Sequence, residues 1–181
     1  MEDISGGINT GYDTDYAYGL MDGIGSDRSE NVKLYFTFNI RNDLFGISVN
    51  LIREVLKFSK VYRIPRVPDY IKGVINLRGE VVPVIDLSGR FYGIESTISE
   101  SSSIIIVEIK DHEERIPVGV MIDSVRAVTE LTDDSIEAAP EIGNRIRPDY
   151  IEGIGKVEGE FAILLKIDNV LKIEELSDFN Q

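Results

Sequence analysis

The fold is decided by residues 69–87, which read DYIKGVINLRGEVVPVIDL. The apolar residues form two runs rich in Val and Ile, and Arg78 and Gly79 lie between them. Glycine takes positive φ values without the penalty that a side chain incurs, and β-branched runs bury well in a sheet. The stretch therefore predicts a β-hairpin with its turn at Arg78 and Gly79.

Much of this stretch returns later in the chain. Residues 149–154, DYIEGI, repeat residues 69–74, DYIKGV, and both copies are followed by a Gly-Glu pair. The similarity extends backward, because residues 45–55 resemble residues 118–128. The chain therefore contains an internal duplication of two tandem copies, each of roughly 75 residues.

The rest of the pattern is also typical of β-structure. Val32, Leu34, Phe36 and Phe38 alternate with polar residues, as in a half-buried strand, and Phe45, Ile47 and Val49 make the returning strand. Residues 167–176 have near-helical apolar spacing and predict a short C-terminal helix. We expect a leader at 1–31 that is disordered, a first unit at 32–92, a serine-rich linker at 93–102 and a second unit at 103–181. Each unit alone would bury only about 60% of its unfolded surface, so the copies are expected to pack together or exchange strands.

Composition excludes several functions. The chain has no cysteine, one histidine and a net charge of −13, which argues against nucleic-acid binding because that affinity depends on Lys and Arg. No signal peptide or membrane-spanning run is present, so a cytoplasmic protein is expected. No residue spacing suits a metal or cofactor, and the adjacent acids, such as Glu113-Glu114, are typical of solvated turns. We therefore expect neither catalysis nor a cofactor.

The charge is unevenly distributed. Residues 1–31 carry seven acids and one base, residues 32–92 five acids and ten bases, and residues 93–181 twenty acids and eight bases. This asymmetry suits two different partners on two faces, although a charged block can also be a solvated surface. The leader, with Tyr12, Tyr16 and Tyr18, is either a mobile tail or a segment that orders on a partner.

The run GVINLRGEVVPVIDL, together with Phe45-Gly46-Ile47 and Ile52-Arg53-Glu54-Val55, closely resembles the CheW family of chemotaxis coupling proteins. The resemblance covers about residues 31–175. It implies a mainly β fold of two small five-stranded barrels of SH3-like or OB-like type. It also implies a non-catalytic scaffold that links chemoreceptors to the histidine kinase CheA.

The resemblance also implies partner-contacting residues. The arginine that matches Arg78 is implicated in receptor coupling and pairs with the glutamate that matches Glu54. Core packing explains some of the other matches equally well, and a solvated turn residue is the alternative for Arg78. In the second copy Lys156-Val157-Glu158-Gly159 replaces Asn76-Leu77-Arg78-Gly79, so the receptor surface is expected on the first copy and a different contact, such as the kinase, on the second. The expected contact residues are Ile52, Glu54, Val61, Arg63, Lys72, Gly73, Arg78 and Gly79.

Two other interpretations remain open at this point. The chain could be a regulatory module of a larger CheA or CheV-type protein, although it begins with Met and shows no kinase nucleotide motif. It could also be an oligonucleotide-binding barrel, an interpretation that its sequence pI of 4.5 disfavours.

Overall fold

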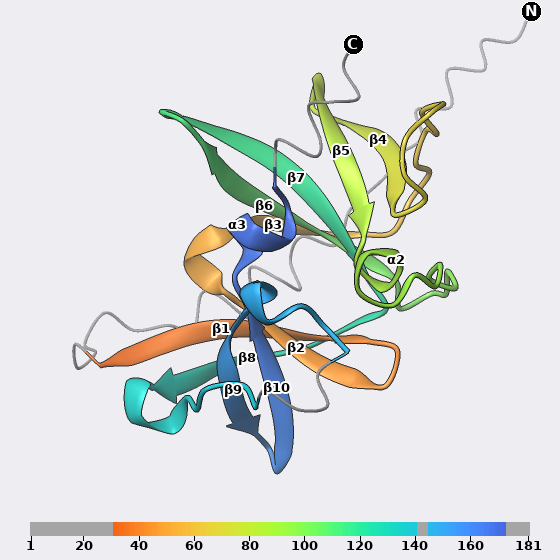
Figure 1. Ribbon diagram of the computed structural model, residues 1–181. Helices are drawn as coiled ribbons and strands as arrows, with labels where there is room; N and C mark the ends of the chain where they lie inside the picture. Colours follow the sequence, from red (N-terminus) through yellow and green to blue (C-terminus); the bar gives the residue numbers. More distant parts are fainter. Residues whose placement is uncertain (1–30, 141–144, 173–181) are drawn as a thin grey trace, which may run out of the picture.

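A computed structural model describes residues 31–140 and 145–172 (Figure 1). Within these residues the chain is mainly β, and ten strands form two five-stranded sheets. The strand order of sheet A is β8-β1-β2-β10-β9, with β1 Val32–Ile40, β2 Asp43–Ser48, β8 Ser124–Thr132, β9 Ile151–Val157 and β10 Glu160–Leu165. The strand order of sheet B is β3-β6-β7-β5-β4, with β3 Ile52–Lys57, β4 Ile71–Leu77, β5 Glu80–Asp86, β6 Ser103–Asp111 and β7 Glu114–Ile122.

The two sheets are equivalent, and each takes strands from both copies. Replacing every strand of sheet A by its counterpart five strands away along the chain reproduces the order of sheet B. In sheet A, β1 pairs with β8 and β2 pairs with β10. In sheet B, β6 pairs with β3 and β7 pairs with β5. A sequence boundary between residues 92 and 103 therefore does not separate the sheets, because the copies have exchanged strands.

The hairpin predicted from residues 69–87 is present as β4 and β5. Its two-residue turn has positive φ at both positions, 50° at Arg78 and 87° at Gly79, and the repeated hairpin β9–β10 has 48° at Glu158 and 85° at Gly159. Turns with positive φ at both positions match the twist of antiparallel strands. Glycine takes positive φ readily, which is why it occupies the second turn position of each hairpin. The side chain of Asn76 supports the first turn by accepting the N–H of Gly79 at 2.9 Å.

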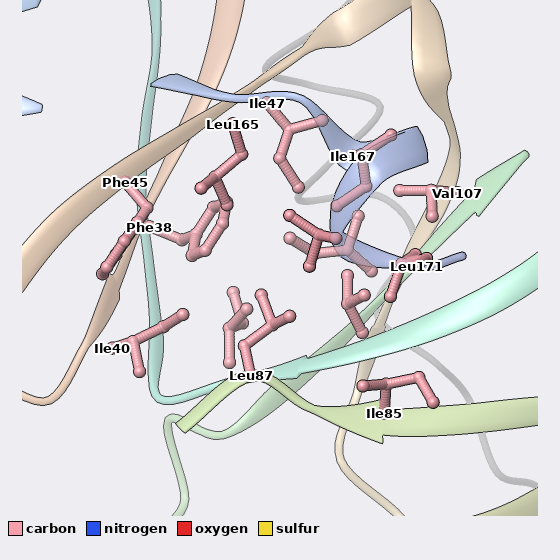
Figure 2. Packing of buried hydrophobic residues seen from close by; sticks show 14 of the residues in the cluster. Phe38, Ile40, Phe45, Ile47, Ile85, Leu87, Val107, Leu165, Ile167 and Leu171 are labelled. Atoms are coloured by element: carbon pink, nitrogen blue, oxygen red, sulfur yellow. The ribbon is translucent and has the colours of Figure 1, made fainter. Parts of the chain in front are cut away.

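The main core lies between the sheets. Figure 2 shows Phe38, Phe45 and Leu165 of sheet A facing Ile85 and Val107 of sheet B, with Leu87 nearby. A smaller apolar cluster lies within each sheet, built on Leu56, Ile75 and Val84 in sheet B and on Tyr35, Leu44 and Leu164 in sheet A. Because the main core draws side chains from both sheets, neither sheet is covered without the other.

Two short α-helices complete the described fold. Helix α2, Leu87–Tyr92, was not expected from the sequence; the Asp86 carboxylate accepts the Ser88 N–H at 3.0 Å and caps it, and Gly93 ends it at φ 66°. Helix α3, Ile167–Val170, begins where the C-terminal helix was predicted and packs on the main core. The leader before Asn31 and the predicted helix beyond Lys172 lie outside the described residues.

Candidate functional site

The tip of the β4–β5 hairpin reaches strand β3 through an ion pair. The Arg78 guanidinium donates to both carboxylate oxygens of Glu54, with Nη1 lying 3.3 Å from Oε2 and Nη2 hydrogen-bonded to Oε1. The Glu54 side chain is 5% exposed, whereas that of Arg78 is 64% exposed. The pair therefore holds a guanidinium toward solvent on a buried carboxylate, a geometry suited to a bidentate partner group.

A second ion pair runs beside the first. Arg53 donates from Nη1 to Glu80 Oε2 at 3.1 Å, and both side chains are exposed. Strand β3 is at one end of sheet B, and β4 is at the other. The two ion pairs thus join β3 to the hairpin at the far end of the sheet, and they bring residues 24 to 27 positions apart in sequence into one surface.

Comparison with the second copy shows which of these two ion pairs is duplicated and which occurs in the first copy alone. Arg126 and Glu160 are the counterparts of Arg53 and Glu80, and they form the same pair at 2.7 Å. The counterparts of Glu54 and Arg78 are Ala127 and Glu158, which cannot pair. The Arg53–Glu80 ion pair is therefore part of the duplicated scaffold, while the Glu54–Arg78 ion pair occurs in sheet B and has no counterpart in sheet A.

Gly73 has a backbone role. Its φ is 140°, and an added Cβ would lie 1.9 Å from the Tyr62 carbonyl oxygen. The missing side chain lets the segment after β3 approach β4, where Tyr62 and Val74 exchange two backbone hydrogen bonds of 2.9 Å each. Gly153 plays the same part in sheet A, beside the bridge between Glu137 and Ile154.

Lys72 lies in an internal network. Its side chain is 12% exposed, and its Nζ lies 3.8 Å from Asp86 Oδ2 and hydrogen-bonds Glu95. The fully buried Asp86 also accepts the Ser96 N–H at 2.8 Å and the Ser96 hydroxyl at 2.6 Å. The hydrogen bond from Lys72 and its charge lower the pKa of Glu95. Lys72 thus anchors the start of the predicted linker on β4 and β5.

The expected contact residues therefore fall into two groups. Glu54, Arg78 and Gly79 meet at the hairpin tip, and Ile52 is buried on the same strand as Glu54. Val61, Arg63, Lys72 and Gly73 surround the connector from β3 to β4, where Val61 packs on the core and Arg63 is 86% exposed. Sequence reasoning missed Arg53, Glu80 and Asp86. The repetition of the Arg53 and Glu80 pair at Arg126 and Glu160 was the signal that could have identified two of them.

A polar hollow of about 610 Å³ lies beside the connector, between residues 63–72 and the end of α2. Its charged lining residues are Arg63, Asp69, Lys72 and Glu95, two of each sign. Across residues 31–140 and 145–172, no group of three or more His, Cys, Asp or Glu side chains is placed to bind a metal ion. No helix in these ranges is long and apolar enough to cross a membrane.

Comparison with known proteins identifies the family. The CheW-like domain matches residues 34–175. The chain belongs to the CheW-like family. It is 33% identical over 143 residues to the chemotaxis protein CheW of Klebsiella aerogenes, covering 79% of this chain and 84% of that protein. Identity to CheW of Bacillus subtilis is 36% over 137 residues, covering 76% and 85%.

A solved CheW structure agrees with this assignment. The crystal structure of the scaffolding protein TtCheW from Thermoanaerobacter tengcongensis is similar with a TM-score of 0.72 and 31% identity, and the match covers 84% of this chain and 95% of that one. The matched CheW-like range includes the Arg53–Glu80 and Glu54–Arg78 pairs and the second-copy pair Arg126–Glu160. The asymmetry between the two hairpins thus lies within the CheW-like domain itself.

Proposed function

We propose that this CheW-like protein is a non-catalytic adaptor that couples chemoreceptors to the histidine kinase CheA in a bacterial signalling array. Family membership over residues 34–175 is the observation that carries the proposal. The composition of the site agrees, because its charged groups are engaged in ion pairs that hold a surface in place. An adaptor needs two dissimilar docking surfaces, and the duplicated fold supplies two equivalent positions with different side chains.

The receptor surface is the β4–β5 tip with strand β3. Arg78 presents its donors to solvent while Glu54 fixes the guanidinium, so a receptor carboxylate or carbonyl group meets a preorganised partner. Arg63 adds an exposed cation on the connector, and Ile52 and Val61 support the surface from the core. Lys72 and Gly73 contribute indirectly, because they fix the connector and β4 beneath it.

The kinase surface is on the second copy. The β9–β10 tip carries Glu158 where the first copy carries Arg78, and the neighbouring Phe161 side chain is 69% exposed. A charge of opposite sign with an exposed aromatic residue suits a partner different from the receptor. Binding to both partners would recruit this cytoplasmic protein to receptor arrays, where weak contacts are strengthened by repetition.

Calorimetric titration of the full chain with the regulatory domain of CheA tests the proposal. We expect saturable binding in the micromolar range, as for a transient interface of standard size. Glu158→Lys should weaken this binding, while Glu113→Lys, a charge reversal on the β6–β7 turn, should leave it unchanged. Absence of heat at high micromolar concentration with a folded protein would contradict the kinase contact.

A CheW-like regulatory module within a larger CheA or CheV-type protein is the alternative. It uses the same domain and the same two surfaces, and it differs in the polypeptide to which the domain is joined. In that case the intact protein would meet its kinase partner within one chain or through a second regulatory domain.

A further inference from the structure

The connector from β3 to β4 forms an exposed basic strip. Residues 55–68 contain four bases and no acid, and Lys57, Lys60, Arg63 and Arg66 are all exposed. Tyr62 and Ile64 lie among these bases and are 57% and 37% exposed. The Lys60 ammonium lies 5.1 Å from the centre of the Tyr62 ring. We call these residues, 57–66, the basic connector.

The duplicated fold indicates that this charge is not needed to build a connector. The equivalent segment of the second copy, residues 133–148, contains four acids and two bases, yet it makes the equivalent backbone bridge at Glu137 and Ile154. Among the acids near these bases is Glu95, whose carboxylate lies 3.9 Å from Arg63. The basic connector therefore has electrostatic capacity for an acidic partner.

We propose that the basic connector is the docking site of the chain's own N-terminal segment, residues 1–30. That segment carries seven acids and one base, with tyrosines at positions 12, 16 and 18 and apolar residues at 20, 21 and 24. Residues 93–181 have a net charge of −12 and repel it, whereas residues 32–92 have a net charge of +5. Acidic side chains meet the four bases, and the aromatic residues meet Tyr62 and Ile64.

The covalent link favours this contact over the same contact between molecules. A tether of 30 residues spans up to about 100 Å when extended, which exceeds the dimensions of a domain with a radius of gyration of about 15 Å. Tethering also gives an effective concentration on the order of millimolar, so modest charge complementarity is sufficient for docking. This proposal concerns a contact within the chain and does not depend on the coupling function, although the basic connector shares Arg63 with the proposed receptor surface.

A spin label on the full-length protein tests the proposal. The chain has no cysteine, so Thr14→Cys provides a single labelling position within the acidic segment. Amide signals of residues 57–66 should lose intensity at about 0.01 M salt, where the Debye length is about 30 Å, and recover at about 1 M salt, where it is about 3 Å. In a mixed sample, one protein carries the spin label at natural isotope abundance and the other is isotope-enriched without a spin label. Intensity loss in this sample reports contacts between chains alone.

Two sets of substitutions identify the groups involved. Asp13→Asn with Asp15→Asn and Asp22→Asn, or Lys57→Gln with Lys60→Gln and Arg66→Gln, should restore the intensity at low salt. Lys110→Gln with Arg115→Gln on the β6–β7 hairpin is the matched control and should not. The substitutions at positions 13, 15 and 22 change no residue of 31–172, and circular dichroism of each variant checks that the fold is retained. Intensity loss elsewhere, no loss, or loss only in the mixed sample would overturn the proposal.

Discussion

At the residue scale, the site depends on an ion pair whose members, Arg78 and Glu54, differ in exposure to solvent. Glu54 is buried in β3, and Arg78 extends over it from the hairpin tip with most of its side chain in solvent. A fully buried pair would lose about 3–5 kcal/mol on removal of one partner, and an exposed pair about 0–1 kcal/mol. This pair lies between the two limits, because truncating Arg78 both removes the partner of Glu54 and admits water to its carboxylate.

Arg78→Ala is therefore expected to lower the free energy of unfolding by about 1–3 kcal/mol, since it leaves a buried acceptor without its charged donor. Urea denaturation followed by circular dichroism measures the change. Arg53→Ala is the control, with an expected loss of about 0–1 kcal/mol because both members of its ion pair are exposed. Equal losses in the two variants would contradict the special position of Glu54.

At the scale of elements, the connectors depend on glycines where the backbones meet. Gly73→Ala would place a methyl group 1.9 Å from the Tyr62 carbonyl oxygen, at a φ of 140° that side chains rarely adopt. Overpacking and strain together predict a loss of about 2–4 kcal/mol. Gly79→Ala has a φ of 87° but no heavy atom within 4 Å of the added methyl group, so about 1 kcal/mol is expected. Thermal or urea unfolding that ranked the two variants in the opposite order would refute this assignment.

Individual elements show how much of the fold could be predicted from the sequence. The 69–87 hairpin follows from its turn chemistry and β-branched runs, and the duplication follows from the repeated DYI motif. Helix α2 was missed because its six residues are too few for a helical period, and its cap, Asp86, reads as the end of a strand. Sequence pattern could not separate Lys72 from Arg78 either, because one is buried beside Asp86 and the other exposed, and burial depends on contacts distant in the chain.

At the scale of the whole molecule, strand exchange makes the two copies interdependent. Each sheet is built from both copies, and the main core lies between the sheets. Neither copy can therefore close its own sheet after the other has unfolded. The relation of the two docking surfaces is fixed by this common core.

We accordingly expect a single cooperative unfolding transition for residues 32–172. Hydrogen exchange should give the same opening free energy for the most protected amides of β2 and of β7, one strand from each sheet, as for global unfolding. Amides of the connector from β3 to β4 should open at lower free energy, since that segment makes isolated backbone hydrogen bonds, such as those of the Tyr62–Val74 bridge, and no continuous ladder. Two resolved transitions, one for each sheet, would contradict the interdependence.

Alkaline pH should weaken the whole fold through a buried tyrosine. Burial, followed by a hydrogen bond to Glu152, raises the pKa of Tyr35 well above its ordinary value of about 10. Above pH 10 the unfolded chain therefore loses the phenolic proton while the folded protein keeps it, so stability is present below that pH and falls as pH rises. Tyr35 is expected to contribute about 1.4 kcal/mol per pH unit to this slope. Urea titrations at neutral and alkaline pH should show a smaller alkaline loss for Tyr35→Phe than for the natural protein.

The most direct test of the coupling surface is the affinity of the full-length protein for a soluble cytoplasmic fragment of a chemoreceptor. The matched variants are Arg78→Ala and Glu158→Ala, at equivalent turn positions of the two hairpins. The account predicts that Arg78→Ala weakens receptor binding at least about tenfold, equivalent to about 1.4 kcal/mol, while Glu158→Ala leaves it unchanged. Unchanged affinity of folded Arg78→Ala protein, or equal losses in both variants, would contradict a receptor surface confined to the first hairpin.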